Sequence, residues 1–126
     1  MAKMNKLSPV LIVEEIESCL AFWTNLGFSK TVEIPEGDKL GFVIFEKDGI
    51  EIMYQSMASV QKDVPSVAEN GLSNSAIYIE CEGLMDLLPK LDKRSIVVNL
   101  RKTFYGSNEV FVREPAGNIV GFAEKG

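Results

Sequence analysis

The pattern of apolar and polar positions near the C-terminus predicts a β-hairpin. Two apolar, β-rich runs at positions 111–113 and 119–122 have the period of strands. The stretch between them, 114–118, holds the proline, glycine and asparagine that are typical of a chain reversal. A fainter copy of the same order (strand, acidic residue, turn glycine, strand) occurs at 42–53. The pattern therefore predicts a chain built from two similar halves.

The first half predicts the order β-α-β-β-β. Positions 7–13 form a nearly continuous apolar run, which is typical of a strand buried on both faces. Apolar residues then recur every three or four positions from Ile16 to Leu26, and Gly27 provides a stop signal for this helix. Three strands are expected after the helix, at 28–34, 40–46 and 50–55, separated by turns at 35–38 and 47–49.

A connector follows the first half. Positions 57–72 have weak periodicity and contain the breakers Pro65 and Asn70–Gly71, so this stretch predicts a bridge with room for one short helix. The apolar, β-branched stretch 75–81 then predicts the strand that opens the second half.

Four leucines between positions 84 and 91 mark an amphipathic helix, although Pro89 lies inside it. A proline in a helix interior costs about 3 kcal/mol. That cost disappears if Asp86 is the N-cap, because Pro89 then falls in the first turn, where its missing N–H has no helical acceptor. The strands expected after this helix are 96–102, 110–113 and 118–123.

The order β-α-β-β-β thus occurs twice, which predicts an α+β fold. A chain of 126 residues with 46% hydrophobic residues suits a single domain with one packed core. We expect one domain over residues 1–126, with a first module at about 5–56, a connector at 57–73 and a second module at about 74–126.

Charge and hydropathy exclude several classes of partner. The 18 acidic residues outnumber 13 basic ones and give a formal charge of −5, which disfavours binding to a phosphate backbone. No apolar run reaches the roughly 18–20 residues of a membrane span, and Glu14 and Glu15 come too early for a signal peptide. We therefore expect a cytoplasmic protein that binds neither nucleic acid nor membrane.

The chain has no histidine and only two cysteines, Cys19 and Cys81. Histidine is the commonest metal ligand and the usual general base near neutral pH, so its absence excludes the usual triads and most transition-metal sites. The two cysteines lack the spacing of a zinc site or a disulfide framework and predict inert, buried thiols.

The duplicated order, with SPVLIVEEIESCLAFWTNLGF at 8–28 and REPAGNIVGFAE at 113–124, resembles the vicinal-oxygen-chelate superfamily, which holds glyoxalases, extradiol dioxygenases, fosfomycin-resistance enzymes and bleomycin-resistance proteins. The resemblance covers nearly the whole chain and is nearest to metal-free, bleomycin-resistance-like members. It implies two tandem βαβββ modules that form an open, U-shaped half-barrel, with helices outside and a ligand cavity on the concave face.

The resemblance also locates the metal-ligand positions of metal-dependent members. Three of them fall on Ser8, Ala76 and Gly121 in this sequence, and the remaining one falls on either Glu51 or Met53. Serine, alanine and glycine cannot bind a divalent ion as the family does, and one carboxylate does not satisfy a hard cation. We therefore expect neither a metal site nor another cofactor.

Strand alternation extends this set to the residues that share the ligand-facing side. Phe111 matches a position where fosfomycin-type members carry a ligand-facing tyrosine. The loop at 103–109 is a candidate rim or an ordinary hairpin loop. A planar or cationic organic ligand would suit these side chains. The predicted ligand-binding residues are Ser8, Glu51, Met53, Ala76, Tyr78, Tyr105, Glu109, Phe111 and Gly121, with Glu80 as a further anionic contact.

Three functions remain open from the sequence. The first is a metal-free protein that sequesters a small organic molecule, as bleomycin-resistance proteins do, usually as homodimers. The second is a glyoxalase-type lyase or isomerase, with a displaced carboxylate site or with Glu51 or Glu109 as base. The third is a non-catalytic structural or regulatory domain with a vestigial cavity.

Overall fold

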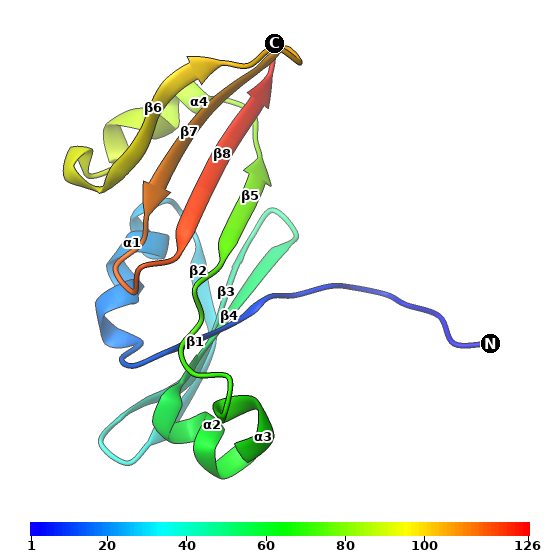
Figure 1. Cartoon of the computed structure of the whole chain (residues 1–126), viewed down its shortest axis with the longest axis vertical. Helices are drawn as coiled ribbons and strands as arrows, with labels where there is room; N and C mark the ends of the chain where they lie inside the picture. Colours follow the sequence, from blue (N-terminus) through cyan, green and yellow to red (C-terminus); the bar gives the residue numbers. More distant parts are fainter. The chain divides into compact units, whose positions relative to one another are not determined.

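The computed structural model describes residues 1–126, and its first compact unit is Met1–Leu72. This unit contains one four-stranded sheet with the strand order β1-β4-β3-β2 (Figure 1). Its elements are β1 Val10–Val13, the 3₁₀ turn η1 Glu17–Cys19, α1 Leu20–Asn25, β2 Ser29–Glu36, β3 Lys39–Lys47, β4 Ile50–Ser56, α2 Met57–Asp63 and α3 Pro65–Ala68.

The second compact unit is Ser73–Gly126 and repeats the plan of the first. Its sheet has the strand order β5-β8-β7-β6. Its elements are β5 Ala76–Glu80, α4 Leu84–Leu87, the 3₁₀ turns η2 Leu88–Lys90 and η3 Lys93–Ser95, β6 Ile96–Lys102, β7 Ser107–Arg113 and β8 Ile119–Lys125. None of the helices combines the length and the apolar composition that a membrane-spanning helix requires.

The two sheets confirm the predicted duplication and the α+β class. In each unit the first strand lies at the sheet edge and pairs in parallel with the last strand, β1 with β4 and β5 with β8. The other strands of each unit pair antiparallel. Each unit is therefore a βαβββ module.

The first helix ends where the glycine predicts. Gly27 has φ +95° and donates its N–H to the carbonyl of Thr24 at 3.0 Å, while the N–H of Phe28 reaches the carbonyl of Trp23 at 3.1 Å. These two bonds are those of a Schellman motif, which satisfies carbonyls left over at the helix end. The predicted start is less regular, because η1 precedes α1.

Trp23 is the centre of the first unit's core. It is fully buried, and its ring lies 5.0 Å from that of Phe28 and 6.5 Å from that of Phe45. Its indole N–H donates to the hydroxyl of Tyr54 at 2.8 Å. This bond satisfies a buried donor, which otherwise costs free energy.

Two predictions for the first module need correction. The strand predicted at 7–13 is only Val10–Val13, because Leu7 lies before it and is 89% exposed. The predicted burial on both faces holds for the consecutive residues Leu11, Ile12 and Val13, whereas Val10 is 44% exposed. Pro35 lies inside β2 instead of a turn, because a register shift between Ile34 and Pro35 accommodates it. The Asp48–Gly49 turn is confirmed, with positive φ at both residues.

In the second module the predicted N-cap is wrong. Gly83 is the N-cap of α4, and the carboxylate of Glu124 on β8 accepts the N–H groups of Gly83 at 2.8 Å and Leu84 at 3.2 Å. Asp86 is therefore not needed as a cap. Pro89 lies in η2 after α4, because a proline cannot donate the next helical hydrogen bond. The connector holds two short helices, not one.

The Trp23–Tyr54 bond predicts a stability effect. Tyr54→Phe leaves the indole N–H without this acceptor, so the free energy of unfolding should fall by about 1–3 kcal/mol in chemical denaturation. A double-mutant cycle with Trp23→Phe isolates the pair, and a coupling energy near zero would contradict this account.

Candidate functional site

The register of the second sheet brings four predicted residues onto one face. Tyr78 of β5 pairs with Gly121 of β8, which in turn pairs with Phe111 of β7. In the next row Glu109 pairs with Arg101 of β6. Directly opposite residues share a face of a sheet, so these five residues form one group, which we call the Glu109 cluster.

The carboxylate of Glu109 is the buried centre of this cluster, with 0% of the residue exposed. Its Oε2 accepts the hydroxyl of Tyr105 at 2.6 Å and a short hydrogen bond from the hydroxyl of Tyr78. Its Oε1 accepts from Arg101 Nη2 at 3.4 Å. A buried carboxylate requires such donors to remain ionised.

These hydrogen bonds change the acidity of both partners. The donors, first Tyr105 and then Tyr78, hold the pKa of Glu109 below its ordinary value. The bond to Glu109 raises the pKa of Tyr78 to about 12. Glu109 therefore stays ionised at neutral pH and is a weak base, while Tyr78 keeps its proton.

Gly121 leaves room for an aromatic ring on this face. A Cβ at position 121 would lie 2.4 Å from Phe111 Cε2, which is far inside van der Waals contact. The Phe111 ring thus lies over β8, with its centroid 6.3 Å from that of Tyr78. The guanidinium of Arg101 lies 6.0 Å from the centroid of Phe111, at cation–π distance.

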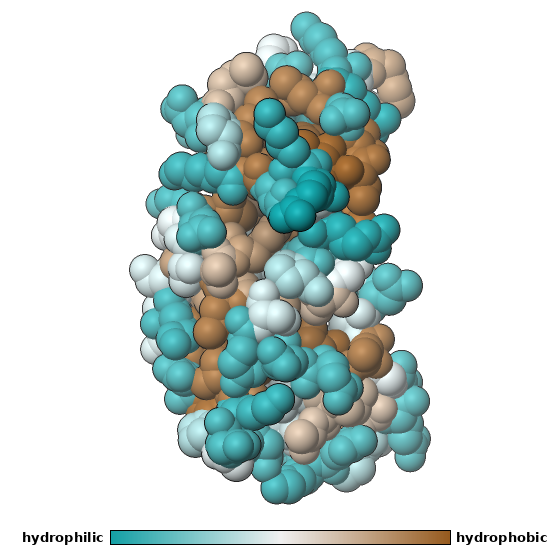
Figure 2. All heavy atoms as spheres, turned by 90° about the vertical axis from the view of Figure 1, so that its left-hand side faces the viewer, coloured by the Kyte–Doolittle hydropathy of each residue, from teal (hydrophilic) through white to brown (hydrophobic).

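The predicted rim is a tight turn between β6 and β7. The N–H of Gly106 bonds the carbonyl of Thr103 at 3.1 Å, and the N–H of Ser107 bonds the Thr103 hydroxyl at 3.0 Å. Tyr105 is 58% exposed although its hydroxyl reaches Glu109, and Phe104 is 99% exposed. On the face of the molecule that Figure 2 shows, hydrophobic residues reach the surface among hydrophilic ones.

The first module brings together Ser8 and Glu51. The Ser8 hydroxyl donates to Glu51 Oε1 at 3.0 Å, and Lys6 Nζ lies 2.9 Å from Glu51 Oε2. Lys6 first, together with Ser8, keeps the pKa of Glu51 below its ordinary value, so this carboxylate is also a weak base. Met53 is aligned with Val10 across the β1–β4 pair.

Two other predicted positions carry little chemistry. Ala76 is exposed and pairs with Ile119. Glu80 forms an ion pair with Lys125 at 3.4 Å, and both side chains are largely exposed. An exposed pair of this kind contributes little stability.

The residues at the superfamily's metal-ligand positions do not fit a divalent ion. Ala76 and Gly121 offer no side-chain donor, and the Phe111 ring occupies the space that a side chain at 121 would need. Ser8 already donates to Glu51. No group of three or more cysteines, aspartates and glutamates in the chain could hold a metal ion.

The candidate residues predicted from the sequence do not include two cations that contact these carboxylates, Arg101 and Lys6. Val98 pairs with Phe111 and Arg101 pairs with Glu109, with a register shift between the two pairs. The shift places Arg101 on the same face of the sheet as Val98, although residues three positions apart in a regular strand lie on opposite faces. Lys6 lies before β1, in a segment with no strand period to read.

No protein-family model and no curated protein matches this sequence, but solved structures do. A bleomycin-binding protein from Streptomyces verticillus, complexed with copper(II)-bleomycin, is 25% identical over 100% of this chain and 99% of its own, with a TM-score of 0.61. TioX from Micromonospora sp. ML1 is 11% identical, with coverages of 96% and 98% and a TM-score of 0.75. Lactoylglutathione lyase from Agrobacterium tumefaciens is 16% identical, with coverages of 98% and 95% and a TM-score of 0.74. One of these proteins binds bleomycin and another is a lyase, so the common fold does not fix one activity.

The Tyr78–Glu109 bond predicts an unusual alkaline titration. In a tyrosinate absorbance titration, the difference between the wild type and Tyr78→Phe should have its midpoint near pH 12. Because the raised pKa disfavours tyrosinate in the folded state, the stability from this group is full below about pH 10 and is lost as pH rises through 12.

Glu109→Gln is the matched variant for this titration. It removes the negative charge, so the Tyr78 midpoint should move toward about 10. A midpoint that stays near 12 in Glu109→Gln would assign the shift to burial alone. Circular dichroism at each pH shows whether the protein is still folded.

The close approach at Gly121 predicts a steric effect. Gly121→Ala should lower the free energy of unfolding by about 1–3 kcal/mol, because the new methyl group collides with the Phe111 ring. In the background Phe111→Leu, the same change should cost clearly less. Equal costs in the two backgrounds would refute the steric account.

Proposed function

We propose, from the premise that this chain has the fold of the vicinal-oxygen-chelate superfamily, that it binds and sequesters a small organic ligand without a metal. The resemblance of the sequence to that superfamily is confirmed at the level of the fold. The finer parts of the proposal are that the ligand is planar or cationic and that the protein acts in the cytoplasm as a homodimer.

The Glu109 cluster carries this proposal. It combines a buried anion with the aromatic side chains of Phe111 and Tyr78, of which Tyr78 is 52% exposed. Tyr105, whose hydroxyl bonds Glu109 from the adjoining turn, is 58% exposed. Exposed aromatic rings beside a fixed negative charge suit a flat ligand with positive charge. The bleomycin-binding proteins among the similar structures support a binding role.

The chemistry of the carboxylates favours binding over catalysis. A general base is most effective when its pKa lies near the working pH, but the pKa values of Glu51 and Glu109 are both lowered. The positions that would hold a catalytic metal lack the necessary donors. A glyoxalase-type reaction therefore has less support than ligand sequestration.

A thermal-shift and calorimetry panel tests the proposal. The panel contains bleomycin, planar aromatic cations and planar aromatic anions. At least one member should stabilise the protein, by about 2.7 kcal/mol at a concentration 100 times its Kd. Tyr78→Leu should weaken the binding of that member about two- to tenfold, because one stacking ring is lost.

Met85→Ala is the matched control, since Met85 is a 67% exposed apolar side chain on α4, and it should leave binding unchanged. A panel without any stabilising ligand would refute sequestration. Elemental analysis of protein purified without chelator is the second arm. Stoichiometric nickel, zinc, manganese or iron would instead favour a metalloenzyme.

A further inference from the structure

Arg101 makes the two contacts that a bound organic cation would make in the Glu109 cluster. Its Nη2 lies 3.4 Å from Glu109 Oε1, and its guanidinium carbon lies 6.0 Å from the centroid of Phe111. One contact is electrostatic and directed at the buried carboxylate. The other is the cation–π contact by which aromatic rings recognise flat cations.

The two oxygens of Glu109 are unequally satisfied. Both tyrosine hydroxyls, those of Tyr78 and Tyr105, donate to Oε2, and the Tyr105 bond is 2.6 Å long. Oε1 has the longer contact with Arg101, at 3.4 Å, where charge-assisted N–H···O bonds are usually about 2.7–2.9 Å. Oε1 is therefore the oxygen that a better-fitting cationic donor could take.

Arg101 can leave this position at modest cost. Its side chain is 55% exposed, whereas that of Glu109 is 1% exposed, so the guanidinium can move into water while the carboxylate stays. Because the arginine end of this ion pair is exposed to water and the N···O contact is long, the pair contributes less free energy than a fully buried, close ion pair does. The carboxylate would keep its two tyrosine donors and would need one replacement cation.

We infer that Arg101 is an internal competitor for the cation site of this protein: a ligand with a planar amidinium or guanidinium group displaces it, bonds Glu109 Oε1 and stacks on Phe111. This inference rests on the proposed function and names its ligand class. It also makes Arg101 a residue that sets specificity, since only a cation that pairs with Glu109 better than the arginine does will bind.

The opposite role, in which Arg101 receives an anionic ligand, has less support. Its guanidinium already faces a buried carboxylate, which would repel an incoming anion at short range. The formal charge of the whole chain is also −5. The two roles differ in what removal of the arginine does to binding.

A fluorescence titration with two probes distinguishes them. The probes are DAPI, a planar aromatic diamidine, and the anionic dye anilinonaphthalene sulfonate. Arg101→Ala should bind DAPI about five- to tenfold more tightly than the wild type, because the competitor is gone. Adding Glu109→Gln to Arg101→Ala should abolish that gain.

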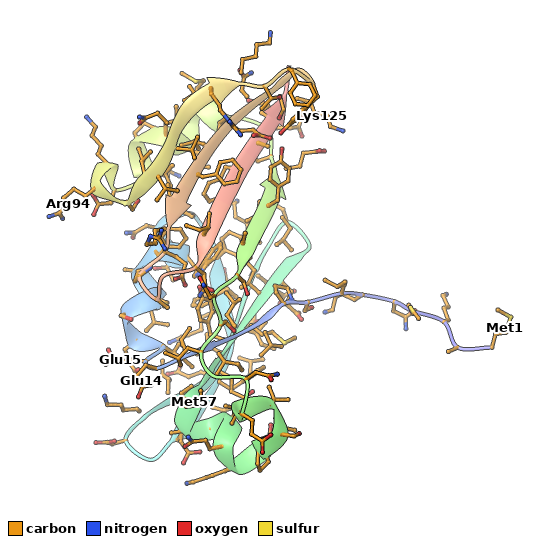
Figure 3. All side chains as sticks on the ribbon, viewed as in Figure 1. Met1, Glu14, Glu15, Met57, Arg94 and Lys125 are labelled. Atoms are coloured by element: carbon orange, nitrogen blue, oxygen red, sulfur yellow. The ribbon has the colours of Figure 1, made fainter.

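Arg94→Ala is the matched control for the change in net charge. The Arg94 side chain is 92% exposed, contacts only Asp92 and points away from the sheet before β6 (Figure 3). It lies in η3, seven residues before Arg101, so most of β6 separates the two arginines. It should bind DAPI as the wild type does, within about twofold of the wild-type Kd.

Each result decides the inference. Equal or weaker DAPI binding by Arg101→Ala overturns it, and weaker binding of the anionic dye alongside would assign the arginine to anion recognition. An equal gain in DAPI affinity in Arg94→Ala would show that the effect comes from net charge, and would also overturn the inference.

If these results occur while bleomycin or another panel member still stabilises the wild type, the proposed function stands without the displacement. If nothing binds, both fail. Circular dichroism and thermal unfolding confirm that each variant is folded.

Discussion

Parallel pairing of the first and last strands of each module is the interaction on which the rest of the structure depends. It places β5 beside β8 and so brings Tyr78 next to Gly121, although 43 positions separate them in the sequence. Antiparallel pairing of β7 with β8 then adds Phe111 to the same row. Without the parallel pair, the Tyr78 hydroxyl would not lie within hydrogen-bond distance of Glu109, and the buried carboxylate would lose a donor.

The chemistry of the second module follows from how its buried charge is satisfied. Hydrogen bonds from two tyrosine hydroxyls, together with the longer contact from the half-exposed Arg101, keep Glu109 ionised, and both tyrosine rings remain half-exposed. The same bonds make the carboxylate a poor base and the phenol of Tyr78 a poor acid. The cluster is thereby suited to recognition through charge and aromatic surface, and unsuited to proton transfer near neutral pH.

Local signals in the sequence predicted the elements well. The Gly27 helix stop and the Asp48–Gly49 hairpin depend on a few neighbouring residues, and the repeat of these signals predicted the duplicated fold. The errors in the second module came from features that have no local signal in the sequence. The cap of α4 comes from Glu124, 40 residues later, and the register shift in β6 turned Arg101 toward Glu109. Neither has a local pattern, so the shared face of the candidate residues could be predicted but not the contacts within it.

The close contact between Gly121 and Phe111 couples the substitutions that this chain tolerates at the two positions. With the phenylalanine present, a carboxylate cannot be introduced at position 121 without a collision, and with the phenylalanine removed first, the sheet face loses the ring that contacts Tyr78. A change between a carboxylate and a glycine at this position thus requires two coordinated substitutions, with a less stable sequence between them. Selection for stability alone would therefore slow any replacement of Gly121 by a residue with a carboxylate side chain.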